Sequence, residues 1–186
     1  MQSNLKPLTD FLVGLGIEAV LHTGKNYLAH LTGVHQLMRS YGLDHELCRA
    51  GLFHSIYGTQ QFQGFKLELQ RRPELESLID PRAERLAFWN CLMDRSSFDG
   101  LLAQADGPYL VRNRETGEIM SLTRGEFDDL ACVHLFDWLE QVRRSSLGWG
   151  YRRAAYQRMA ERAGTTAQRA YEAVFSMAPT PPQHDR

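Results

Sequence analysis

The sequence lacks the features that mark secreted, membrane-spanning or nucleic-acid-binding proteins. Its three cysteines, Cys48, Cys91 and Cys132, are odd in number and scattered, which suits buried thiols better than a disulfide framework. No apolar run approaches the roughly 20 residues that span a bilayer. The N-terminus lacks the charged segment and long apolar run of a secretion signal. A formal net charge of -1 gives no positive excess for binding nucleic acid or an acidic membrane. We therefore expect a cytoplasmic protein with no nucleic-acid or membrane partner.

The overall composition is that of an ordinary globular domain. Hydrophobic residues make up 43% of the chain and charged residues 23%. The length of 186 residues is enough for one domain with a hydrophobic core. We see no internal repeat and no low-complexity linker. We therefore predict a single domain over residues 1–177, followed by a disordered tail over 178–186, and the oligomeric state stays open.

Most of the chain shows helical periodicity, with apolar residues three or four positions apart. Asp44 and Asp80 are predicted N-caps, and Pro81 suits a first helical position. Thr123 with Glu126 has the pattern of a capping box, and Thr165 is predicted to cap the last helix. The helices are expected within residues 24–42, 42–56, 80–93, 127–144, 150–164 and 166–177.

One stretch breaks the helical pattern. In "YLVRNRETGEIMSLT", residues 109–123, two β-prone runs flank the turn sequence "ETGE". This pattern predicts a hairpin. The expected fold class is therefore mainly α, with a small β-hairpin inserted.

Three polar residues interrupt apolar helical stripes. His30 lies beside an apolar stripe, His54 ends the run "AGLFH", and Asp137 lies within "HLFDWLEQ". A buried carboxylate is costly unless a cation or hydrogen-bond donors meet it. Two histidines and an aspartate from three helices can meet on one divalent metal. The alternative is a metal-free core in which His30 or His54 donates a hydrogen bond to Asp137.

These residues also carry a resemblance to a known family. The stretch "YLAHLTGVHQLMRSYGLDHELCRAGLFHS" resembles the first part of an HD domain, an all-helical metal-dependent fold, and the RelA/SpoT-type alarmone hydrolases have the closest pattern. His30 begins the pattern, Tyr41–Asp44 match its middle, and Ala50–Ser55 match its end. "HLFDWLEQ" aligns with a later motif of that family and puts Asp137 at its last metal ligand. The resemblance implies an HD-like helical bundle with His30, His54 and Asp137 as metal ligands.

The chain departs from that family in its acid–base residues. Ser55 stands where the family has the aspartate of its His-Asp signature, and Gly58 and Thr59 replace a downstream Glu-Asp pair. "AGLFHSIYGT" also looks like a bacterial, uncharacterised HD-like family that carries this serine. The resemblance therefore implies the scaffold and three of four ligands, without the hydrolase's equipment for handling water.

Three functions remain open from the sequence. The first is a hydrolase, acting on a phosphoester, that depends on one divalent ion, manganese or iron. The second is a mononuclear non-haem iron oxygenase with a 2-His-1-carboxylate site. The third is a non-catalytic HD-like module for ligand binding or regulation. All three imply a small-molecule substrate or ligand.

Four further residues are candidates for the site. His22 is a candidate fourth metal ligand, or else a loop residue. Ser55, Gln141 and Glu84 are candidate catalytic residues. The alternative for Ser55 is a hydrogen bond to a carbonyl one turn back. Gln141 lies one turn beyond Asp137, and the alternative for Glu84 is an exposed ion pair with an arginine of its own helix.

Overall fold

The computed structural model describes residues 5–179, and these residues are mainly helical. The observed fold confirms the predicted class, mainly α with a small β insertion. Residues 180–186 lie outside the described residues, so the disordered tail expected over 178–186 stays a prediction. The α-helices are α1 (Lys6–Gly14), α2 (Tyr27–Ser40), α3 (His45–Phe53), α4 (Arg72–Ile79), α5 (Pro81–Leu92), α6 (Arg95–Leu101), α7 (Arg124–Gln141), α8 (Arg153–Arg162) and α9 (Thr165–Phe175).

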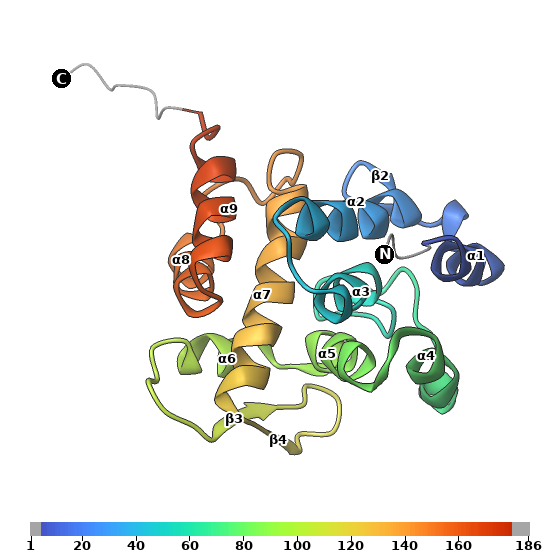
Figure 1. The fold of residues 1–186 in the computed structure, drawn as a ribbon, viewed down its shortest axis with the longest axis horizontal. Helices are drawn as coiled ribbons and strands as arrows, with labels where there is room; N and C mark the ends of the chain where they lie inside the picture. Colours follow the sequence, from blue (N-terminus) through green and yellow to red (C-terminus); the bar gives the residue numbers. More distant parts are fainter. Residues whose placement is uncertain (1–4, 180–186) are drawn as a thin grey trace.

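Helix α7 crosses the middle of the molecule. It contacts α2, α3 and α5 on one side and α8 and α9 on the other (Figure 1). All its residues from Leu130 to Leu139 are buried. A helix surrounded by other helices is normally apolar on every face. His134 and Asp137 are therefore exceptions that need partners inside the core.

Helices α2 and α3 pack closely against each other beside α7. Gly51 on α3 permits this approach, because a Cβ atom there would collide with the Sδ atom of Met38 on α2. Asp44 caps α3 as predicted, and its side chain accepts a hydrogen bond from the backbone N–H of Leu47 at 2.9 Å. The close approach at Gly51 therefore holds the C-terminal end of α3 against α2.

A small hairpin precedes α2, where the sequence predicted only helix from residue 24 onward. Strands β1 (Leu21–His22) and β2 (Lys25–Asn26) pair antiparallel across a tight turn. Asn26 then caps α2 by accepting a hydrogen bond from the backbone N–H of Ala29 at 2.7 Å. Helix α2 therefore starts at Tyr27, and the hairpin before it contacts the C-terminal end of α7.

The second hairpin is the predicted one. Strand β3 (Tyr109–Arg112) pairs antiparallel with β4 (Ile119–Leu122) near the N-terminal end of α7 (Figure 1). Thr123 and Glu126 form the predicted capping box that starts α7.

Two predicted caps differ from the structure. Asp80 stands at the N-cap position of α5 and Pro81 begins that helix, but the Asp80 side chain makes an ion pair with Arg49 and caps nothing. The prediction for Thr165 is wrong, because α9 starts at Thr165 itself after an N-cap glycine, Gly164. At both positions the helix begins without a hydrogen bond from a capping side chain.

The remaining predictions on composition can be compared directly. Cys48, Cys91 and Cys132 are all free and buried, as expected of thiols without a disulfide framework. No helix in the described part of the chain is long and apolar enough to cross a bilayer.

Candidate functional site

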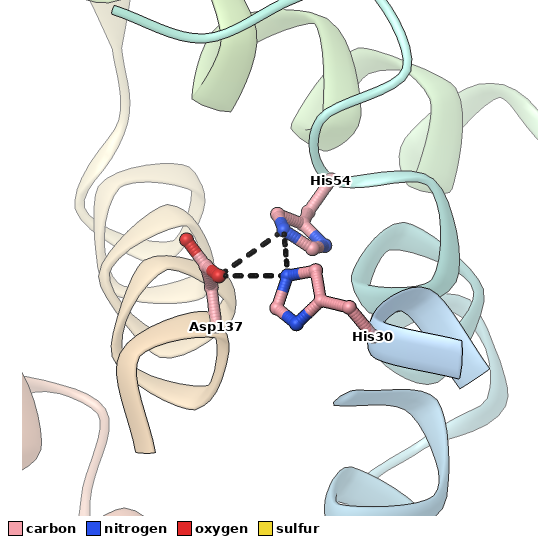
Figure 2. A group of neighbouring side chains, drawn as sticks. All are labelled: His30, His54 and Asp137. Atoms are coloured by element: carbon pink, nitrogen blue, oxygen red, sulfur yellow. Dashed lines mark hydrogen bonds and ion pairs between the residues drawn. The ribbon is translucent and has the colours of Figure 1, made fainter. Parts of the chain in front are cut away.

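His30, His54 and Asp137 meet in the core, as the sequence predicted from three separate helical segments. The Nε2 atoms of the two histidines lie 3.2 Å apart, and each lies 3.2 Å from Oδ1 of Asp137 (Figure 2). All three residues are buried. His30 comes from α2, Asp137 from α7, and His54 directly follows the last residue of α3. We call this arrangement the His–His–Asp triangle.

Hydrogen bonds on the far side of each ring decide which nitrogen faces the triangle. Nδ1 of His30 lies 2.5 Å from Oε2 of Glu140, and Nδ1 of His54 lies 2.8 Å from the carbonyl oxygen of Gly51. A carboxylate and a carbonyl can only accept, so each Nδ1 atom carries the hydrogen. In the neutral rings, both Nε2 atoms then present lone pairs to the carboxylate oxygen of Asp137.

Three acceptor atoms that face one another need a cation or a proton between them. Ligand atoms about 2.1 Å from one ion lie about 3.0 Å apart at right angles and about 3.4 Å apart at the tetrahedral angle. The observed separations of 3.2 Å fall between these values. The triangle therefore has the donor set and spacing to hold one divalent metal ion.

Glu140 supports His30 from the side opposite the triangle. Lys25 and Arg144 form ion pairs with the Glu140 carboxylate, the latter at 2.5 Å from Nη2 to Oε2. Gly33 on α2 leaves room for it, since a Cβ atom there would lie 2.7 Å from Oε1 of Glu140. Such an outer carboxylate fixes the ring orientation and raises the basicity of a metal-binding histidine.

The same end of α7 holds Asp137 in place. Nε2 of Gln141 donates to Oδ1 of Asp137 at 2.7 Å, and Oγ1 of Thr23 in the first hairpin donates to Oε1 of Gln141 at 3.0 Å. Nε of Arg144 donates to the carbonyl oxygen of Thr23 at 2.8 Å. The turn between β1 and β2 is thereby fixed to α7 beside the triangle.

The charges of these groups follow from their partners. Burial opposes ionisation of Asp137, but His54 and His30 hold the pKa of its carboxyl well below its ordinary range. Burial opposes charge on His30, yet hydrogen bonds with Asp137 and Glu140 raise its pKa. Burial likewise works against the Glu140 carboxylate, and hydrogen bonds from His30 and Arg144 lower its pKa to about 2. Without a metal, a proton on His30 is the remaining way to neutralise the triangle.

A pocket of about 490 Å³ opens beside the triangle. His54 and Asp137 form part of its wall, so an ion held there faces the pocket. The rest of the wall is mostly polar and aromatic, with residues from the first hairpin, the segment after α3, α6, α7, the segment between α7 and α8, and α8. Among these residues are Thr23, Thr59, Gln61, Arg95, Trp138, Gln141, Arg144 and Tyr156.

Ser55 and Gln141 both line this pocket. The alternative predicted for Ser55 does not hold, because its Oγ lies 2.9 Å from the phenol oxygen of Tyr27 and makes no bond to a carbonyl one turn back. Both residues of that pair are buried. A catalytic role for Ser55 or Gln141 stays a prediction, with the structure placing both where a ligand can reach them.

His22 lies next to the triangle without being a corner of it. Its ring centroid is 4.3 Å from that of His30 and 4.5 Å from that of Phe62. Burial and the neighbouring His30 lower its pKa to about 4, and its Nε2 atom is buried with no partner among the described residues. The nitrogens of His22 are not among the atoms that meet at the triangle. Its role as a fourth ligand stays a prediction.

Glu84 is not brought together with the other candidates. Its carboxylate is buried and accepts two hydrogen bonds from Arg72, at 2.7 and 2.8 Å, and one from the Tyr57 hydroxyl at 2.8 Å. The expected alternative, an exposed pair with an arginine of its own helix, is wrong in both partner and burial. Glu84 does not line the pocket beside the triangle.

Sequence reasoning missed the supporting role of Glu140. The signal was available in part, because Glu140 and Gln141 follow Asp137 by three and four residues and so share its helix face. Which side chain each would meet on α2 and on the first hairpin is a matter of tertiary packing. Arg144 follows Glu140 by four residues, a spacing that favours an ion pair within a helix, whereas nothing near Lys25 pointed to Glu140.

Comparison with known proteins adds one match. Residues 11–95 match the model of a domain of unknown function, DUF6817. The matched stretch includes His22, His30 and His54 and ends before Asp137. No curated protein and no solved structure matches the chain.

Proposed function

We propose that this protein is a divalent-metal-dependent hydrolase that acts on a small molecule, with an HD-like helical scaffold. One observation carries the proposal. Two histidine Nε2 atoms and one carboxylate oxygen converge at 3.2 Å from one another, with the outer hydrogen bonds of both rings directing their lone pairs inward. Acceptors arranged in this way are stabilised by a cation.

The open side of the triangle supports catalysis over a purely structural site. Three protein ligands leave positions free for water and substrate, as in catalytic zinc sites, whereas structural zinc sites are closed by four protein ligands. A divalent ion at this place supplies an acidified water and a Lewis acid for a phosphoryl oxygen. His54 and Asp137 line a pocket of about 490 Å³, which is a suitable size for a small substrate.

The chain's own residues then divide into two roles. His30, His54 and Asp137 hold the ion, while Glu140 and Gln141 orient His30 and Asp137 from outside. The replacement of the HD aspartate by Ser55 removes a bridging ligand, which favours one ion over two. This count is part of the proposal.

A second candidate function rests on the same three ligands. Two histidines and one carboxylate on one face are the ligand set of mononuclear non-haem iron oxygenases. The identity of the metal that supports turnover separates the two candidates.

The test is turnover by protein stripped with a chelator and reloaded with Mn²⁺ or, without oxygen, with Fe²⁺. Phosphomonoesters are assayed for release of inorganic phosphate, phosphodiesters are assayed for release of the alcohol, and oxygen uptake is recorded for the iron form. Hydrolysis that depends on metal, is lost in Asp137→Asn and is kept in Asp106→Asn, whose side chain is exposed, supports the hydrolase. Oxygen uptake by the iron form alone supports the second candidate. No turnover in any assay, with or without metal, contradicts both candidate functions and leaves a ligand-binding module.

A further inference from the structure

We infer that the pocket beside the triangle binds a small molecule through an anionic group, a phosphate or a carboxylate, held by the guanidinium of Arg95. This inference deepens the proposed function, because it names the substrate class of the same site. It also stands on residues other than the proposed metal ligands.

Arg95 is the clearest unmatched group in the pocket wall. It lies at the start of α6, is partly buried and lines the pocket. In the described part of the chain its guanidinium has no carboxylate partner and no hydrogen-bond acceptor. Two nearby arginines differ, because Arg144 is paired with Glu140 and Arg152 with Asp99. A guanidinium offers five donors in a fork that matches phosphate and carboxylate oxygens.

The balance of charge in the wall favours an anion. Asp137 is the only carboxylate among the lining residues, and the lining arginines are Arg95 and Arg144. The charge of Arg144 is offset by Glu140, and that of Asp137 is offset by a bound ion or by a proton on His30. The charge of Arg95 is then left uncompensated in a pocket with low-dielectric walls. Such a pocket attracts ligands of negative charge.

Trp138 supplies a second unmatched donor. It lines the pocket, and its indole Nε1 atom is buried with no hydrogen-bond partner among the described residues. An indole N–H can only donate, and a buried donor without an acceptor is costly. An oxygen-rich ligand that reaches this buried N–H would satisfy it together with the guanidinium of Arg95. Neutral apolar ligands satisfy neither.

The pocket is sized for a small molecule. Its volume of about 490 Å³ lies within the range of roughly 300–1,000 Å³ for small-molecule sites. The stacked rings of Trp138 and Tyr156, 5.2 Å apart and nearly parallel, form one part of the wall. The ligand we infer is therefore a compact, acceptor-rich anion.

The test is isothermal titration calorimetry with three probes: inorganic phosphate, benzoate, and benzamide as the neutral counterpart of benzoate. In Arg95→Gln we expect the Kd for the anions to rise about tenfold or more, because a charge-assisted bond is lost. Arg95→Lys should recover part of this loss, and Trp138→Phe should weaken anion binding while keeping a ring. Arg158→Gln, an exposed arginine on α8, is the matched control and should bind like the wild type. Benzamide binding should not depend on Arg95.

Each probe that binds through Arg95 identifies the anion, phosphate or carboxylate, that the site prefers. Unchanged affinity for both anions in Arg95→Gln, or no binding of either anion to the wild type, overturns the inference.

The titrations are run on metal-loaded and on chelator-stripped protein so that the two proposals fail separately. Bound metal with no effect of Arg95→Gln contradicts the inference alone. Anion binding that depends on Arg95 in a protein that holds no metal contradicts the proposed function alone.

Discussion

Nδ1 of His30 lies 2.5 Å from Oε2 of Glu140, while Nε2 of the same ring lies 3.2 Å from Oδ1 of Asp137. Both carboxylates come from one face of α7, three residues apart. A single helix therefore holds an imidazole ring of α2 at both edges. This relationship fixes the ring in one tautomer when it is neutral and also stabilises its protonated form when no cation is present.

The first prediction concerns Glu140. Glu140→Gln keeps the size of the side chain but removes the charge that makes His30 a more basic ligand. Loss of an outer carboxylate of this kind typically weakens metal binding about 10–100-fold. The measurement is the metal Kd by competition with a chelating dye. Glu172→Gln, an exposed glutamate of α9, serves as the control. An unchanged Kd in Glu140→Gln would mean that the pair does not tune the ligand.

Individual residues show which features of the fold and the site could be predicted from the sequence. His30, His54 and Asp137 were predictable because polar residues on apolar helix stripes need partners, and because their order resembles that of an HD domain. The hairpin at residues 109–123 was predictable from its own turn sequence. These signals are local, or they depend on the spacing of a few residues.

Other features depend on contacts between segments far apart in the sequence. The sequence around Glu84 does not indicate its ion pair with Arg72 of α4. The sequence around Ser55 does not indicate its hydrogen bond with the Tyr27 hydroxyl. The first hairpin was hidden because its strands have two residues each, too short for any alternation. Sequence periodicity identifies inward-facing side chains but not their partners.

The second prediction concerns Ser55 and Tyr27. Ser55→Ala leaves the buried Tyr27 hydroxyl without its 2.9 Å partner, which should cost about 1–2 kcal/mol of unfolding free energy. Tyr27→Phe should cost a similar amount, and the double variant less than the sum of the two. Denaturant unfolding of all four proteins gives this cycle. Additive losses would show that the two hydroxyls do not depend on each other.

Turnover of the same variants separates structure from catalysis. If Ser55 serves only Tyr27, the rate per folded molecule in Ser55→Ala and in Tyr27→Phe should fall by similar small factors. A far larger loss in Ser55→Ala would assign Ser55 a direct role.

The third prediction concerns Glu84. Glu84→Ala removes a buried carboxylate that Arg72 and Tyr57 hold, leaving both without an acceptor. We expect about 2–3 kcal/mol of destabilisation, at the lower end for buried pairs because Arg72 is one-third exposed. Bound metal should not change. Glu74→Ala, which breaks an exposed pair with Arg71, should have little effect on the unfolding midpoint. Loss of metal in folded Glu84→Ala would return Glu84 to the site.

The fourth prediction is a pH dependence of stability that arises at His134. This ring is fully buried, with Nδ1 3.0 Å from Oδ1 of Asn90 and Nε2 accepting a hydrogen bond from Arg152 at 2.9 Å. Burial, then Arg95 and Arg152, lower the pKa of His134 well below 6.5, and nearby Asp137 only partly opposes them. At a pH below 6.5, His134 therefore binds a proton in the unfolded chain but stays neutral in the folded chain.

The sign of the effect follows from this difference. The contribution of His134 is complete above pH 6.5 and is lost progressively as the pH falls below 6.5, because the unfolded chain then takes up a proton that the folded chain does not. Unfolding free energies over this range should have a smaller slope in His134→Gln than in the wild type. His45→Gln, an exposed histidine, is the control. Equal slopes in wild type and His134→Gln would contradict the assignment.

The most direct measurement is the metal content of protein purified without chelators or metal-affinity resin, determined by elemental analysis. We predict about one equivalent of a divalent transition metal, manganese or iron, in the wild type and in His45→Ala. His54→Ala and Asp137→Asn, each checked to be folded, should hold almost none. Wild-type protein that stays metal-free even after anaerobic loading with Mn²⁺ and Fe²⁺ would contradict the central claim, as would equal metal content in all four proteins.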